Sequence, residues 1–127
     1  MEPVQLFDLA SRQARWLSVR QAVLAGNVAN ANTAGYKPMD VDSFANVLAK
    51  TSPTMAATNA RHIGGDGFRS DIGVSERETE VPVRPSGNAV RLEEELVKAG
   101  EVRREFELNT AIVKAFHRMI LMAARTT

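Results

Sequence analysis

The 127-residue sequence contains no cysteine, which excludes disulfides, thiolate metal ligands and a cysteine nucleophile. It also lacks an excess of charge of one sign, because 16 Lys and Arg residues face 15 Asp and Glu residues. This balance argues against a large surface for nucleic acid or anionic membrane. No apolar run approaches the ~20 residues of a membrane span, and residues 1–10 lack the basic and apolar regions of a cleaved signal peptide. We therefore expect no nucleic-acid partner and no membrane span.

Glycine and proline are scarce at both ends of the chain. Six of the eight glycines and four of the five prolines lie between Gly35 and Gly87. Since both residue types interrupt helices, the sequence predicts three parts. These are an N-terminal helix that ends in an asparagine-rich segment (1–37), an irregular middle with a possible short helix (38–86) and a C-terminal helix (87–127). The short helix is expected over 41–50, capped by Asp42 or Ser43, and residues 76–83 could form an edge strand or an extended loop.

Apolar residues recur every seven positions at both ends. The N-terminal series is Leu9, Trp16 and Val23, and a second series follows one position on. The C-terminal series is Leu92, Ala99, Phe106, Val113 and Ile120. This period is typical of long amphipathic helices that pair as a coiled coil. We expect a mainly α fold in which a helix over about 4–31 pairs with one over about 89–125, with Asn88 as a candidate cap and Gly100 as a possible bend.

The apolar stripes are wider than the single seam that pairing of two helices buries. Two interpretations remain open: a helical bundle that buries the surplus within one chain, or packing against other subunits. A shortage of further helices favours assembly. The predicted assembly faces are Leu9, Trp16, Val23, Leu92, Phe106, Val113 and Ile120.

The stretch from Asn27 to Pro38 reads NVANANTAGYKP. Asparagine side chains can satisfy backbone groups where a helix ends. Gly35 can adopt a positive φ at little cost, and Pro38 blocks further helix. The residues alone therefore predict a helix stop, with an unusual density of asparagine.

This stretch resembles the N-terminal signature of the flagellar rod, hook and hook-associated axial proteins. The agreeing positions are Asn27, Val28, Asn30, Asn32, Thr33, Gly35, Tyr36 and Lys37. Two further segments, 87–97 and 58–63, resemble a proximal rod member of the family. A sister proximal rod protein fits less well, because it has a P-N-V-N-V approach to its last helix where this chain has Gly87-Asn-Ala-Val90.

The resemblance implies a structural subunit of the proximal rod of the bacterial flagellar basal body. Such a subunit would leave the cytoplasm by type III export without a cleaved signal and assemble helically in the periplasm. Implied partners are other rod proteins, copies of itself, the adaptor protein and MS-ring at the rod base, and the export gate. Phe44 and Leu48 resemble the F-x-x-x-hydrophobe pattern that the gate recognises; alternatively, this face packs on the long helices.

Candidate catalytic groups are sparse. His62 and His117 lie in different segments without a second ligand at metal spacing, and Asp40 and Asp42 have the pattern of turn and cap residues. We therefore expect no enzyme, no cofactor and no metal. A DNA-binding regulator would need short helices with a basic recognition helix. A coiled-coil adaptor or secretion chaperone would share the long helices but would lack the asparagine signature.

Overall fold

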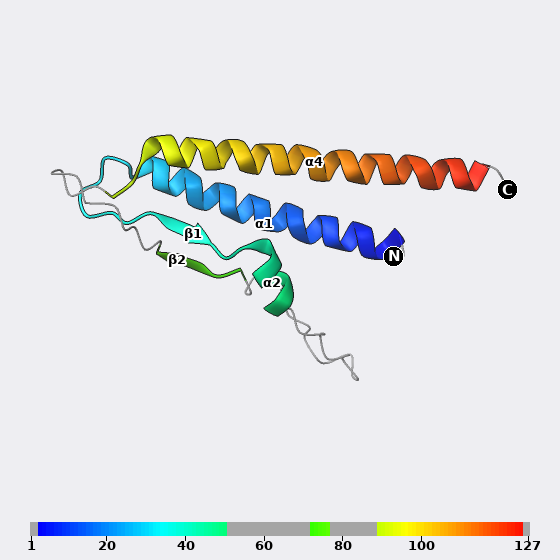
Figure 1. Cartoon of the computed structure of the whole chain (residues 1–127), viewed down its shortest axis with the longest axis horizontal. Coiled ribbons are helices and arrows are strands. Elements are labelled where there is room, and N and C mark those ends of the chain that lie inside the picture. The colour runs from blue at the N-terminus through cyan, green and yellow to red at the C-terminus, as the bar shows by residue number, and fades with distance from the viewer. Residues whose placement is uncertain (1–2, 51–71, 77–88, 126–127) are drawn as a thin grey trace, which may run out of the picture.

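The computed structural model describes residues 3–50, 72–76 and 89–125 (Figure 1). Within these residues the elements are α1 (Pro3–Ala29), β1 (Met39–Val41), α2 (Phe44–Lys50), β2 (Val74–Glu76) and α4 (Leu92–Arg125). The expected mainly α fold is confirmed, because α1 and α4 run antiparallel and pack against each other along their length. The predictions at Asn88, His62, 58–63 and 77–83 lie outside the described residues.

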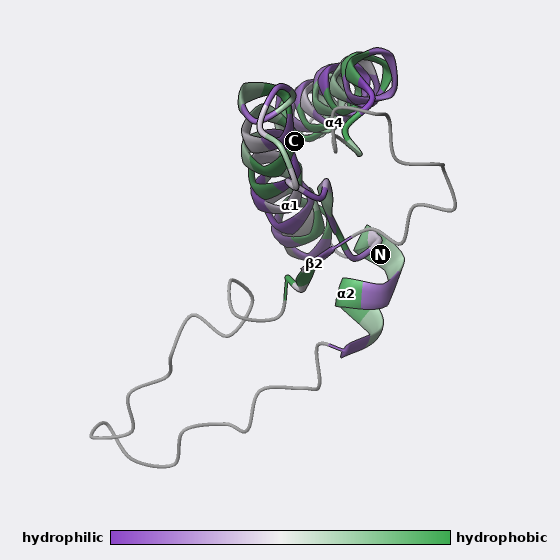
Figure 2. Cartoon of the chain, turned by 90° about the vertical axis from the view of Figure 1, so that its left-hand side faces the viewer, coloured by the Kyte–Doolittle hydropathy of each residue, from purple (hydrophilic) through white to green (hydrophobic). Residues whose placement is uncertain are grey.

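Helix α1 lies at the centre of the fold. Figure 2 shows α4 beside it on one side, with α2 and β2 on the other. The core consists of buried side chains of α1, α2 and α4 together with Ile72, which precedes β2: Trp16, Leu17, Leu24, Val47, Ile72 and Val102. Half of these residues come from α1, so this helix is buried on two faces.

A short antiparallel strand pair covers α1 on the side away from α4. Met39 pairs with Glu76, and Val41 pairs with Val74. The interpretation of Asp40 as a turn residue was therefore wrong, since Asp40 lies within β1. Each strand has three residues, which is too short for an alternating pattern to stand out. The partner strand lies more than 30 residues away along the chain, so local sequence could not reveal the pairing.

Helix α2 is capped by one of the two residues that the sequence predicted for this role. The Asn46 N–H donates to Oγ of Ser43 at 3.3 Å, and the Val47 N–H donates to the Ser43 carbonyl at 3.0 Å. Ser43 is thus the N-cap. The Asp42 carboxylate instead accepts from Nζ of Lys50 at 2.6 Å. The fully buried Val47 anchors the helix in the core.

Helix α4 begins at Leu92, three residues later than the spacing predicted. Its first backbone bond runs from the Glu95 N–H to the Arg91 carbonyl at 3.1 Å. Gly100 lies inside the helix without interrupting it. Open space surrounds the position that a Cβ would take at Gly100, so close packing does not require glycine there.

The line of α4 that is most deeply buried against α1 is not the apolar series that starts at Leu92. It is the line offset by three residues, in which Glu95, Val102 and Asn109 are buried. Leu92 and Phe106 remain 44% and 47% exposed. The two helices thus meet across a seam that contains two polar side chains.

Candidate functional site

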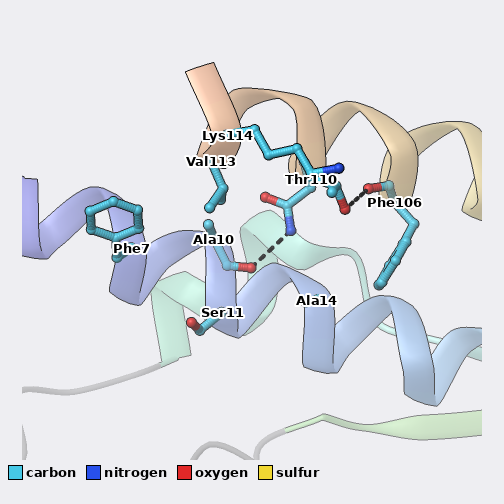
Figure 3. A pocket seen from close by; sticks show the side chains of 9 residues that line it. Phe7, Ala10, Ser11, Ala14, Phe106, Thr110, Val113 and Lys114 are labelled. Atoms are coloured by element: carbon cyan, nitrogen blue, oxygen red, sulfur yellow. Dashed lines mark hydrogen bonds between the residues drawn. The ribbon is translucent and has the colours of Figure 1, made fainter. Parts of the chain in front are cut away.

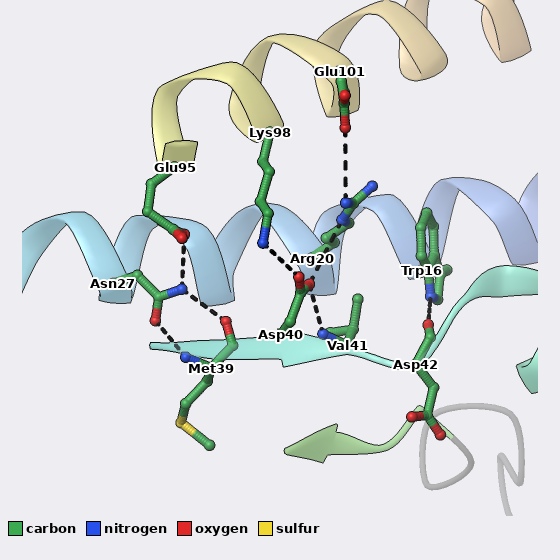
Figure 4. Close-up of polar contacts among 10 residues, drawn as sticks. All are labelled: Trp16, Arg20, Asn27, Met39, Asp40, Val41, Asp42, Glu95, Lys98 and Glu101. Atoms are coloured by element: carbon green, nitrogen blue, oxygen red, sulfur yellow. Dashed lines mark hydrogen bonds and ion pairs between the residues drawn. The ribbon is translucent and has the colours of Figure 1, made fainter. Parts of the chain in front are cut away.

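The signature folds around the side chain of Asn27, which is fully buried at the end of α1 (Figure 4). Its Nδ2 donates to the Met39 carbonyl at 2.7 Å and to Oε2 of Glu95 at 2.8 Å. Its Oδ1 accepts from the Met39 N–H at 2.9 Å and from the Tyr36 hydroxyl at 3.3 Å. These bonds use the full capacity of a primary amide. One side chain therefore joins α1, β1 and α4.

The chain reversal after α1 is closed by its own polar groups. Asn30 Nδ2 donates to the Gly26 carbonyl at 2.9 Å, and Thr33 Oγ1 donates to Asn30 Oδ1 at 3.2 Å. Backbone bonds satisfy the last carbonyls, since the Ala31 N–H donates to the Val28 carbonyl at 3.2 Å and the Thr33 N–H donates to the Asn30 carbonyl at 2.9 Å. Gly35 has φ of 76°, the single positive φ among the described residues. The predicted helix stop therefore forms, and it directs the chain back along α1 as β1.

Besides Thr33, three signature residues have side chains that lie at the surface. Val28 and Asn32 are exposed. Lys37 Nζ contacts Oε2 of Glu76 at 3.2 Å, and both side chains are largely exposed. An exposed ion pair of this kind contributes little to stability. The local fold thus accounts for Asn27, Asn30 and Gly35 but places no comparable demand on these three positions.

A cluster of charges links the same elements one turn away from Asn27 (Figure 4). Lys98 Nζ lies 2.8 Å from Oδ2 of Asp40, and Arg20 Nε lies 3.8 Å from Oδ1. Arg20 also reaches Glu101 at 3.9 Å. Burial raises the pKa of Asp40, but hydrogen bonds from Lys98 and the Val41 N–H, with the charges of Lys98 and Arg20, lower it below its ordinary value. The ionised Asp40 therefore holds α4 to β1.

Trp16 links α1 to the segment that runs from β1 into α2. Its Nε1–H donates to the Asp42 carbonyl at 2.8 Å, and its ring lies 5.9 Å from the ring of Phe44. The Arg20 guanidinium lies 5.4 Å from the centre of the indole. Of the residues predicted for assembly faces, Trp16 is thus buried in the core of its own chain.

The remaining predicted assembly residues divide between two environments. Leu9, Val23, Val113 and Ile120 are half-buried, whereas Leu92 and Phe106 are exposed. Near the N-terminus of α1, Phe7 and Phe116 meet edge to face at 5.9 Å. A groove of about 320 Å³ lies here between the helices (Figure 3), and its lining residues are Phe7, Ala10, Ser11, Ala14, Phe106, Asn109, Thr110, Val113 and Lys114.

Among the described residues, exposed large apolar side chains concentrate on α4, whose last turns extend past the start of α1 (Figure 1). Besides Leu92 and Phe106, the large apolar side chains exposed there are Leu96, Val97, Leu108, Ile112, Met119, Leu121 and Met122. Scattered apolar residues are normal on a surface, but a concentration of them on one element marks an interaction site.

The sequence pattern assigned no role to Glu95 or Lys98 of the junction, and it indicated a turn residue at Asp40. Glu95 is one of three consecutive acids in the first turn of α4 and does not stand out from them by residue type. A possible signal was its place three residues after Leu92, on the line that completes the heptad seam. Lys98 and Asp40 are 58 positions apart in the chain, and neither stands in a motif.

Neither metal ligation nor membrane spanning is indicated by the part of the chain that the structure describes. No group of three or more His, Asp or Glu side chains is placed there to hold a metal ion. None of the described helices is long and apolar enough to cross a membrane. His117 lies exposed on α4.

The known proteins that this chain resembles match it across this junction. Residues 11–37, from α1 through the asparagine-rich turn, match the family model described as "Flagella basal body rod protein". The chain is also 47% identical over 129 residues to the "Flagellar basal body rod protein FlgB" of Agrobacterium fabrum, covering 98% of this chain and 96% of that protein. The resemblance drawn from Asn27–Lys37 is thereby confirmed and extended to α4. This chain belongs to the flagellar basal body rod protein family.

Proposed function

We propose that this rod subunit builds the proximal end of the flagellar rod, where it assembles helically with copies of itself and with other rod proteins. The observation that carries this proposal is the apolar outer face of α4, which stays exposed after α1 has been covered on two sides. The likeness to a FlgB over nearly the whole chain supports the proximal position. It also favours a FlgB-type subunit over the sister proximal rod protein FlgC.

The mechanism of assembly follows from the one-sided burial of α4. With 34 residues, α4 is about 50 Å long. We expect the neighbour to meet this face with a different surface of its own, one that includes Leu9 and Val23, which are only half-buried on α1. A contact between two different surfaces need not close on itself, so subunits add without limit into a tube or filament. In this proposal Leu92, Phe106, Val113 and Ile120 contact one neighbour, and Leu9 and Val23 contact another.

Further partners follow from the family. The subunit would cross the inner membrane through the flagellar type III export gate without a cleaved signal. It would then join the rod in the periplasm, near the MS-ring and its adaptor protein. The role is structural, with no catalytic step.

Phe44 and Leu48 are proposed as an export cue. The alternative is that this face of α2 only packs on the long helices, and the structure gives the contacts that such packing involves. Phe44 packs on Trp16, and Leu48 lines a shallow groove with Leu9 and Arg12. In the folded chain this contact covers part of the Phe44 ring, which supports the packing interpretation. A gate could therefore read both side chains only before α2 docks.

The export cue is tested by Phe44→Ala in cells that also make the unaltered protein. An export role predicts that the variant accumulates in the cytoplasm. A packing role predicts that it is exported but is absent from the rod. Asn46→Ala, at an exposed position of the same helix, is the matched control and should behave as the unaltered protein does.

The rod assignment is tested by fractionation of purified basal bodies. The unaltered chain should copurify with them, whereas the double variant Leu108→Glu/Met122→Glu should fold and be exported but be missing from the rod. Arg104→Ala, at an exposed polar position of α4, should be incorporated normally. A coiled-coil adaptor or chaperone would instead stay a soluble small oligomer, and absence of the unaltered chain from basal bodies would refute the proposal.

A further inference from the structure

The seam between α1 and α4 contains two buried polar residues that the apolar heptads do not require. Glu95 and Asn109 lie fourteen positions apart on the same line of α4, with Val102 between them. Glu95 accepts from the Asn27 amide at 2.8 Å. Asn109 Nδ2 donates to the backbone carbonyl of Ala10 at 2.9 Å. Each polar residue of α4 thus has one defined partner on α1.

The apolar residues of this seam repeat with the same period on both helices. Ala10, Leu17 and Leu24 are buried at intervals of seven on α1, facing the heptads of α4. A slip of one heptad would therefore leave apolar side chains opposite apolar side chains. Hydrophobic burial depends on area and not on direction, so it distinguishes weakly between the two alignments.

The polar residues distinguish the alignments strongly. A slip of α4 toward the C-terminal end of α1 would bring Asn109 beside Leu17. The side chain of leucine is larger than that of alanine and would shield the backbone carbonyls from the Asn109 amide. The same slip would carry Glu95 beyond the end of α1 at Ala29. A slip in the other direction would move Asn109 to the first residues of α1 and separate Lys98 from Asp40. A buried polar group that loses its hydrogen-bond partner destabilises the alignment that contains it.

We propose that Glu95 and Asn109 set the register in which α4 pairs with α1. A polar residue at a seam position can specify the alignment of paired helices at some expense of stability. The register determines where the exposed apolar face of α4 lies relative to the asparagine signature. Because both helices belong to one chain, their register is a property of the single subunit. A test of the register therefore does not depend on rod assembly.

The test measures the helix alignment in the full chain. Since the sequence has no cysteine, spin labels can be attached at Ala22→Cys on α1 and Ala111→Cys on α4, both exposed. The measurement uses an osmolyte that favours the folded state. With the natural seam, pulsed electron paramagnetic resonance should give one distance. In Glu95→Leu/Asn109→Leu, a second distance displaced along the axis by about 10 Å, one heptad, should gain at least about tenfold in population.

Glu107→Leu is the matched control, because it makes the same acid-to-leucine change at an exposed position of α4. It should keep the single distance. Retention of one distance in the double variant, with unchanged helix content by circular dichroism, would overturn the proposal. Loss of helix in the double variant would also overturn it, since the two residues would then serve stability and not alignment. A mixture of distances with the natural seam would overturn it as well.

Discussion

The two long helices have similar amphipathic sequences but different surroundings. Helix α1 is covered by α4 on one side and by β1 and α2 on the other, and among its described large apolar side chains only Val28 is exposed. Helix α4 is covered on one side and exposes large apolar residues from Leu92 to Met122. The comparison teaches that an apolar stripe shows that a helix needs partners but not whether its own chain provides them. In this subunit α1 organises the fold, and α4 carries the surface left for others.

The difference between the two helices is tested most strongly by replacing one aromatic residue in each helix. Trp16→Ala should lower the free energy of unfolding by about 3–5 kcal/mol, because it removes a buried indole and leaves a cavity. Phe106→Ala should cost about 1 kcal/mol, because that ring is nearly half exposed already. Urea denaturation monitored by circular dichroism gives both values. Equal losses would show that α1 and α4 are equally involved in the fold.

The next effect concerns the end of α1. Asn27→Ala should destabilise the chain by about 2–3 kcal/mol, because it removes hydrogen bonds to Met39, Tyr36 and Glu95 in a buried site. Asn32→Ala, in the same signature but exposed, should change stability by less than about 0.5 kcal/mol. The same denaturation series tests this pair. If Asn32→Ala proved the more costly, the junction would not be centred on Asn27.

Glycine substitutions provide a smaller and opposite pair of effects. Gly35→Ala should destabilise by about 1 kcal/mol, because Gly35 has a positive φ that alanine adopts with strain. Gly100→Ala should stabilise by up to about 1 kcal/mol, because it lies inside α4 with open space around it. Thermal unfolding should therefore shift in opposite directions. A destabilising Gly100→Ala would indicate that α4 needs to bend at that point.

The smallest effect concerns the charges between the two sides of α1. The folded-state pKa of Asp40 is below its ordinary value, so its ion pair with Lys98 stabilises the fold above the unfolded pKa of about 4. This contribution is lost as the pH falls through the lower folded value. The unaltered chain should therefore lose more stability than Asp40→Asn between pH 5 and pH 3, values chosen around that unfolded pKa. Urea titrations at each pH measure this, and parallel losses in the two chains would contradict it.

Features that depend on neighbouring residues could be read from the sequence. The spacing of apolar residues predicted both long helices, and Ser43 was one of two expected caps for α2. The helix stop at Asn27–Pro38 followed from asparagine, glycine and proline chemistry. These features form through contacts three or four residues apart and through the φ preferences of single residues. The same stretch carried the family resemblance that the comparisons confirmed.

Only the tertiary structure decided which side chains meet across the chain. Asn27 and Glu95 are 68 positions apart, and Asp40 and Lys98 are 58 apart. An acid or a lysine on an amphipathic helix has the same pattern whether solvent or a partner faces it. The pairing of β1 with β2 likewise depends on a return of the chain that no local signal marks. Sequence by itself determined the helices and the turn, because their energetics are local. The polar seam and the exposed face of α4 depend on how those helices align, which is set by the packing of the whole chain.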